Sequence, residues 1–251
     1  MNSKLRQPVL GLLAAIGVTT AMDATGYGIF SALPLWPLAG LFWFLQKIGR
    51  REIGLTWGTA KGYLWAAMYP IFVLGALGFA ANLAGAVDIS EADWGKAGRN
   101  ILLMGGTTVL VTILTEEGFF RGWLWASLSR IYDSRRKVLL ISSVGFACWH
   151  ISAVVFMEEL TLPLAQMPVY MANVVLIGLN WGLMRQQSGS LVVPSLSHGI
   201  WNGITYVLFG FGTHEGELGI AATSVWGPET GWVGLIANGM FFIFYRRWLQ
   251  R

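Results

Sequence analysis

Long stretches with almost no charged residues restrict the fold of this 251-residue chain more than any other feature. The hydrocarbon core of a bilayer is about 30 Å thick, so a helix needs about 20 mostly apolar residues to cross it. Eight runs of suitable length occur, at residues 8–22, 27–46, 62–87, 98–116, 138–157, 161–184, 190–211 and 227–245. The sequence therefore predicts an all-α, polytopic bundle of about eight transmembrane helices.

The composition agrees with membrane insertion. Hydrophobic residues make up 55% of the chain and charged residues only 12%, with a mean hydropathy of +0.56. Charged residues make up about 25% of a typical soluble domain. Cys148 is the only cysteine, which excludes an internal disulfide. No internal repeat or long linker divides the chain, so we expect one integral membrane domain over residues 1–251.

The first apolar run has a second interpretation. Lys4 and Arg6 precede it, as basic residues precede the apolar part of a secretory signal peptide. Further predicted spans follow immediately, so we favour a transmembrane helix.

Prolines inside the predicted spans include Pro34, Pro37, Pro70 and Pro168. Proline lacks a backbone donor and kinks a helix interior, and neighbouring helices can satisfy the carbonyls that lose their partners. We expect kinks at these four positions.

Lysine and arginine are concentrated at one end of the predicted bundle. With eight spans, both chain ends lie on the side that holds Lys4, Arg6, Lys47, Arg50, Arg51, Lys61, Arg130, Arg135, Arg136, Lys137, Arg185, Arg246, Arg247 and Arg251. The opposite side holds Lys96 and Arg99, and Arg121 lies just inside a span end. By the positive-inside rule, the basic side and both termini are cytoplasmic. This orientation accounts for the pI of about 9.4, so we expect a lipid bilayer and no nucleic acid as partner.

Few ionisable side chains fall within the spans, and those few are informative. A charge at the centre of a membrane helix costs about 3 kcal/mol or more. Glu116 and Glu117 end the fourth predicted span, His150 lies inside the fifth and His198 inside the seventh. His214 is in a loop, where we expect it to be solvated.

The spacing of these residues predicts which side chains share a helix face. Glu117 and Arg121 are four residues apart, a spacing that suits an ion pair. Glu116 points about 100° away from Glu117. Because pairing lowers the basicity of a carboxylate, Glu116 is the better candidate for a general base.

Two further pairs show the same spacing. His198 and Asn202 are four residues apart, and so are Phe146 and His150. A carboxylate, two imidazoles and an amide on different helices can meet only in the bundle interior.

This set of side chains suits the hydrolysis of a peptide bond. A carboxylate beside an imidazole can hold a water and take its proton, while His and Asn donors stabilise the oxyanion that forms. Glu116, His150 and His198 could instead hold a divalent metal such as zinc. The chain has no HExxH motif, and asparagine is a poor zinc ligand, so we favour hydrolysis without a metal cofactor.

The motifs resemble those of the CAAX protease and bacteriocin-processing family (CPBP or Abi) of intramembrane endopeptidases, which includes the type II CAAX prenyl endopeptidases. The first motif stands as EEGFFRG, with Glu116, Glu117 and Arg121. The others are Phe146 with His150, and His198 with Asn202. The three motifs occur in the family's order on separate spans, within a core of about residues 98–211, and REIGLTWG resembles the segment that precedes this core.

The resemblance implies an eight-helix membrane enzyme with a polar cavity that opens toward the cytoplasm. It implies that Glu116 and His150 activate water and that His198 and Asn202 form the oxyanion site. Glu117 and Arg121 become a supporting pair, and Phe146 a supporting residue. Some descriptions call the family metalloproteases, so a metal bound by Glu116, His150 and His198 remains the alternative.

Other functions fit parts of the same pattern. Glutamate and arginine at a helix end can extend to the membrane–water interface, and a buried histidine can form a hydrogen bond between two helices. A catalytically silent relative would act as a bacteriocin-immunity or scaffold protein, and a proton-coupled transporter would also bury Glu and His. The predicted substrate is a membrane-tethered or lipidated peptide, such as a prenylated CAAX tail or a bacteriocin leader.

Overall fold

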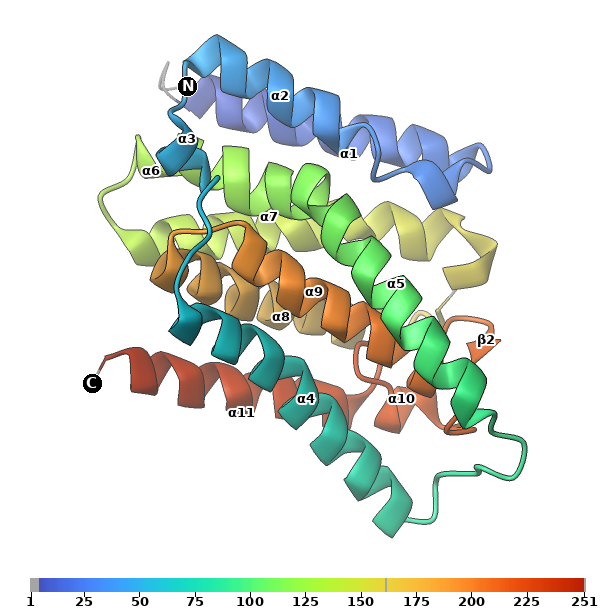
Figure 1. Cartoon of the computed structure of the whole chain (residues 1–251). Helices are drawn as coiled ribbons and strands as arrows, with labels where there is room; N and C mark the ends of the chain where they lie inside the picture. Colours follow the sequence, from blue (N-terminus) through green and yellow to red (C-terminus); the bar gives the residue numbers. More distant parts are fainter. Residues whose placement is uncertain (1–4, 161, 251) are drawn as a thin grey trace.

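The computed structural model describes residues 5–160 and 162–250 and shows a helical bundle (Figure 1). Its longer helices are α1 (Arg6–Ala24), α2 (Leu35–Gln46), α4 (Ala60–Leu83), α5 (Trp94–Leu114), α7 (Arg135–Phe156), α8 (Met167–Ser188), α9 (Val192–Ile204) and α11 (Trp232–Leu249). The shorter elements are α3 (Arg50–Ile53), α6 (Trp125–Ser129), α10 (Thr223–Trp226), the 3₁₀ turns Gly28–Phe30 and Glu158–Leu160, the π-helical segments Gly118–Leu124 and Thr205–Phe209, and strands β1 (Gly210–Phe211) and β2 (His214–Glu215). The predicted all-α class is confirmed.

Six helical segments of the described part are long and apolar enough to cross a membrane. They are Arg6–Ala24, Gly28–Gln46, Ala60–Leu83, Trp94–Ser129, Arg135–Phe156 and Met167–Ser188. The chain is therefore an integral membrane protein. The seventh and eighth predicted spans correspond to α9 and α11, which are not among the six, so the total of eight stays a prediction.

The fourth span is longer than the sequence suggested. The prediction that it ends at Glu116 is wrong, because after a break at Thr115 the helical path continues to Ser129. The added residues are apolar and buried, with Phe119, Phe120 and Trp123 each fully enclosed. Glu116 and Glu117 thus lie within a bent helical segment rather than at its end.

Three of the four prolines lie at helix starts rather than in helix interiors. Pro34 caps the start of α2, Pro37 lies in its first turn, and Pro168 is the second residue of α8. The first backbone N–H groups of a helix have no acceptor within the helix, so proline is tolerated there without a kink. Pro70 is inside α4, as expected. The sixth span begins at Met167, later than predicted, and residue 161 lies outside the described residues.

Glycines allow α5 and α9 to pack closely. A Cβ atom on Gly199 would meet the side chain of Val109 and the carbonyl of Gly105, and one on Gly203 would meet the carbonyl of Ile101. Gly199 and Gly203 are four residues apart, the small-residue spacing that lets membrane helices approach each other. This contact brings the His198 face of α9 against the helix that leads to Glu116.

Both ends of the chain lie at the same end of the bundle, and β2 lies at the opposite end (Figure 1). Helices α3 and α6 are at the end that holds the termini, as the distribution of basic residues requires. Of the lysines and arginines assigned to the basic side, Lys4 and Arg251 lie outside the described residues. Which end faces the cytoplasm stays a prediction.

Cysteine labelling tests this orientation. In a Cys148→Ala background, Asp133→Cys and Thr213→Cys place one exposed thiol at each end of the bundle. Because lysine and arginine cluster near Asp133, we expect a membrane-impermeant maleimide to label Asp133→Cys only from the cytoplasmic face and Thr213→Cys only from the other. The reverse pattern would refute the predicted topology.

Candidate active site

A break in the backbone positions the two glutamates. Thr115 adopts φ −97° and ψ −100°, outside the helical region, and the segment Gly118–Leu124 continues as a π-helix. A side chain on Gly118 would collide with the carbonyl of Ile113, so the tight bend requires glycine at this position. Such π-helical insertions occur frequently at functional sites.

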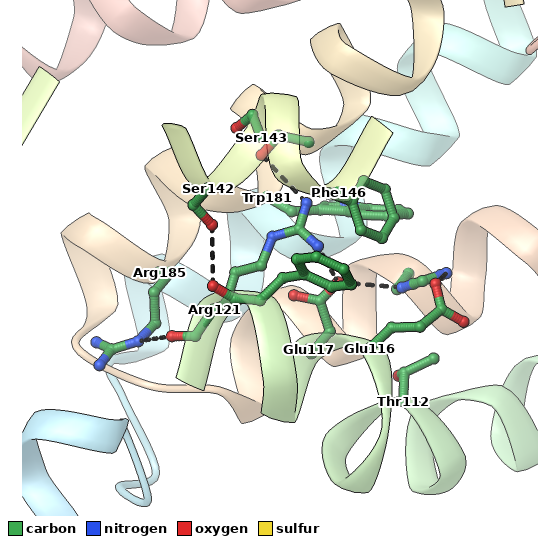
Figure 2. Close-up of polar contacts among 12 residues, drawn as sticks. Thr112, Glu116, Glu117, Arg121, Ser142, Ser143, Phe146, Trp181 and Arg185 are labelled. Carbon is green, nitrogen blue, oxygen red and sulfur yellow. Dashed lines mark hydrogen bonds and ion pairs between the residues drawn. The ribbon is translucent and has the colours of Figure 1, made fainter. Parts of the chain in front are cut away.

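Glu117 and Arg121 form the predicted ion pair. Their side chains are fully buried, and 3.1 Å separates Arg121 Nη1 from Glu117 Oε1. Arg121 Nη2 also donates to the carbonyl of Gly178 at 3.3 Å. The guanidinium lies 4.2 Å from the ring centre of Phe146 and 5.5 Å from that of Trp181 (Figure 2). These contacts give Phe146 a role that its apolar character did not indicate, because an aromatic face stabilises a buried cation.

His198 is held by the same carboxylate. Its Nδ1 lies 3.1 Å from Glu117 Oε1, and its ring stacks on Trp181 with the centres 4.0 Å apart. An ionised carboxylate can only accept, so Nδ1 carries the proton and donates to Glu117. Nε2 then faces Glu116, at 3.9 Å from Oε2.

His150 faces the same oxygen of Glu116 as His198 does. Its Nδ1 lies 2.9 Å from the carbonyl oxygen of Phe146, which can only accept, so Nδ1 carries the proton. In the neutral ring Nε2 therefore presents a lone pair, 4.0 Å from Glu116 Oε2. The ring packs edge-on against Phe146 and Trp149, with centres 4.4 and 4.7 Å away.

Glu116 has different surroundings from Glu117. It points away from Arg121 (Figure 2) and has both imidazoles near one oxygen. At 3.9 and 4.0 Å the three groups are too far apart for direct hydrogen bonds but suitably spaced for a shared water.

These side chains line one cavity of about 70 Å³. Its walls comprise Glu116, Phe146, His150, Tyr170, Val174, Ile177, Trp181, His198, Asn202, Tyr206 and Glu229. A water needs about 10–15 Å³, whereas ligand pockets usually measure about 300–1,000 Å³. The cavity can hold several waters, and a peptide must widen it to enter.

The cavity extends toward the end of the bundle that carries the β-strands. Tyr170 in the first turn of α8 contacts Phe211 of β1, with ring centres 6.0 Å apart. The chain termini lie at the other end (Figure 1). The predicted opening toward the cytoplasm stays a prediction.

The structure also adds residues that the sequence did not single out. Tyr170, Tyr206 and Glu229 line the cavity together with the predicted set. Glu229 belongs to the stretch WGPETGW, which we interpreted as a loop and the start of the last span. The sequence did show that Glu229 is an ionisable residue at the edge of an apolar run. Nothing in the local pattern indicated that it lies near His198.

The spacing of the alternative metal ligands is wide for zinc. Donor atoms around a tetrahedral zinc are about 3.4 Å apart, because each lies about 2.0–2.1 Å from the metal. Glu116 Oε2 is 3.9 and 4.0 Å from the two Nε2 atoms. Within residues 5–160 and 162–250, no group of three or more His, Cys, Asp or Glu side chains is arranged to hold a metal ion.

Comparison with protein families gives one match. Residues 98–204 match the family described as type II CAAX prenyl endopeptidase Rce1-like. Comparison with curated proteins and with solved structures gives no match. The matched range contains the three motifs, from Glu116 to Asn202, and confirms the resemblance inferred from them. Residues 98–204, which carry the three motifs, are therefore similar to the type II CAAX prenyl endopeptidases.

Proposed function

We propose that the protein is an intramembrane endopeptidase that hydrolyses a peptide bond of a membrane-associated peptide or protein with a water activated by Glu116 and His150. The observation that carries this proposal is the position of Glu116. Its Oε2 faces Nε2 of both histidines at 3.9 and 4.0 Å, inside a cavity with room for water.

The protonation of His150 orients the attacking water. Because Nδ1 donates to the carbonyl of Phe146, the lone pair of Nε2 can accept one hydrogen of the water while Glu116 accepts the other. The lone pairs of the water oxygen then point toward the substrate carbonyl. As the C–O bond forms, Glu116 takes the proton and the carbonyl π electrons move to oxygen.

His198 and Asn202 are placed to stabilise the resulting oxyanion. They lie one turn apart on α9 and both line the cavity. The Nδ1 proton of His198 is directed to Glu117, so donation to the oxyanion requires a second proton on Nε2. Glu117 holds the ring through Nδ1, and Arg121 and Trp181 keep the carboxylate and the ring in place.

The surroundings favour a substrate that is already in the bilayer. The long helices of the described part have many exposed apolar residues, including Leu102, Leu103 and Leu110 of α5. A membrane tether raises the local concentration of a peptide at such a site. The substrate class, a lipidated or membrane-tethered peptide, follows from the family and is part of the proposal.

Mass spectrometry of reaction products tests the function. Purified wild-type protein and the Glu116→Gln variant are incubated in lipid vesicles with prenylated CAAX peptides and with bacteriocin leader peptides. New peptide ends that require Glu116 support the proposal. Cleavage of no candidate by the wild-type protein, with a cellular effect that survives Glu116→Gln, would favour the scaffold function.

Chelation tests whether the reaction needs a metal. If Glu116 and His150 hold the water without a metal, hydrolysis is expected to persist after dialysis against a strong chelator of divalent cations. Elemental analysis of the dialysed protein provides the control. Loss of activity that zinc restores, with one zinc per chain, would refute the metal-free mechanism and assign Glu116, His150 and His198 as ligands.

A further inference from the structure

Glu229 is a third carboxyl group in the cavity, and neither the three motifs nor the family match includes it. It lies between α10 and α11 and is 8% exposed. Its Oε1 accepts a hydrogen bond of 2.7 Å from Nε1 of Trp201. Trp201 directly precedes Asn202, so the contact joins Glu229 to the proposed oxyanion site.

A buried network holds the backbone around Glu229. Asn173 Nδ2 donates to the carbonyl of Glu229 at 2.9 Å, and Asn238 Nδ2 donates to the carbonyl of Pro228 at 3.3 Å. Asn238 also donates to Asn173 Oδ1 at 3.0 Å and accepts from the hydroxyl of Tyr69 at 2.6 Å. Asn173, Asn238 and Tyr69 are fully buried, and a satisfied buried network of this kind makes a segment rigid.

The charges around the three glutamates differ. Glu117 is paired with Arg121, and Glu116 has two imidazoles within 4.0 Å. Among the described residues, no Lys, Arg or His nitrogen lies within 4.0 Å of the Glu229 carboxyl. A buried carboxyl with no counter-charge favours its neutral form, so Glu229 is the group in this cavity best suited to carry a proton at rest.

We propose that Glu229 is the acid that protonates the leaving nitrogen. This inference rests on the proposed peptidase function. Glu229 lines the same cavity of about 70 Å³ as Glu116, so a peptide bond bound there meets both carboxyl groups. Oε1 of Glu229 is occupied by Trp201, which leaves Oε2 to face the substrate.

The proton balance is complete without another reactant. Glu116 takes a proton from the attacking water, and the tetrahedral intermediate then collapses. The C=O bond re-forms, the C–N bond breaks, and the nitrogen takes the proton from Glu229. The products are a carboxylic acid and an amine. Transfer of the proton from Glu116 to Glu229 through water in the cavity restores the starting state, so the two carboxyls divide the base and acid roles between them.

Leaving-group dependence provides the test. The substrate found by mass spectrometry is prepared with its scissile amide, and in a second form with an ester at the same position. An amide nitrogen must be protonated to leave, whereas an ester oxygen depends much less on an acid. We expect Glu229→Gln to lower kcat for the amide about 100-fold or more, with KM unchanged and a much smaller loss for the ester. Glu116→Gln should slow both substrates.

Two further variants separate chemistry from folding. Glu229→Gln keeps an oxygen that can accept from Trp201, and Glu229→Asp keeps the acid, so Glu229→Asp should cleave the amide faster than Glu229→Gln. Glu215→Gln changes an exposed glutamate on β2 and should behave as wild type.

Three outcomes would overturn the inference alone, provided that wild-type protein cleaves the amide. They are unchanged activity of Glu229→Gln, equal losses for amide and ester, and a higher KM with unchanged kcat. If the wild-type protein cleaves neither form, the proposed function fails and this inference fails with it.

Discussion

Substitution of Glu116 by glutamine is expected to slow hydrolysis about 10²–10⁴-fold, the range that a positioned general base contributes. Glutamine has nearly the same shape but cannot accept the proton of the water. Single-turnover rates of wild-type and variant protein in vesicles measure the effect. The folded state should be little changed, because Glu116 has no ion pair with Arg121 and lies at 3.9 and 4.0 Å from the histidines.

The neighbouring glutamate serves as the comparison for this experiment. Glu117→Gln should reduce activity but not abolish it, because Glu117 acts through His198 and Arg121 rather than on the water. An active Glu116→Gln variant, or a stable but inactive Glu117→Gln variant, would show that the roles of the two glutamates are exchanged.

Glu117→Gln is also expected to lower the free energy of unfolding by about 3–5 kcal/mol, because it leaves a buried guanidinium without its counter-charge. Both side chains of the pair are fully buried, so bulk solvent does not reach Arg121 to replace the lost carboxylate. Reversible unfolding in detergent, followed by tryptophan fluorescence, measures the change.

The ion pair between Glu52 and Arg130 provides a matched control. Its separation of 2.7 Å is shorter than that of the buried pair, but its side chains are 44% and 39% exposed. Glu52→Gln should therefore cost only about 0.2–1 kcal/mol. Equal losses from Glu52→Gln and Glu117→Gln would contradict the prediction.

A double variant tests the physical reason for the large loss. Glu117→Gln with Arg121→Met removes both charges, and replacing a buried pair by apolar groups is often nearly neutral. We expect the double variant to recover part of the lost stability but not the activity, because His198 still lacks its carboxylate acceptor. A double variant no more stable than Glu117→Gln would show that the loss has another origin.

Much of the fold could be predicted because membrane insertion is a local property. A run of about 20 apolar residues specifies a spanning helix whatever its neighbours are. Helix ends were less predictable. The fourth span continues past Glu116 because Phe119, Phe120 and Trp123 find a buried environment, which depends on packing with other helices.

Part of the proposed site could be predicted because helical spacing, like membrane insertion, is a local property of the sequence. Residues four apart on a helix share a face, so the Glu117–Arg121 pair followed from spacing alone. The three motifs also sufficed to identify the family. The contact between the Arg121 guanidinium and the Phe146 ring could not be predicted from spacing, because the two residues are on different helices.

By itself, the sequence determined that this protein is a membrane-embedded helical bundle, that residues 98–204 resemble the CAAX prenyl endopeptidases, and that a few ionisable residues lie inside the spans. Hydrophobic length and helical period act over a few turns, and both can be counted along the chain. Only the tertiary structure decided which nitrogen of His150 and His198 faces Glu116, because the acceptors are the carbonyl of Phe146 and the carboxylate of Glu117. It also decided that Glu229, which lies after the matched region, reaches the same cavity, because contacts between distant segments depend on packing and not on local pattern.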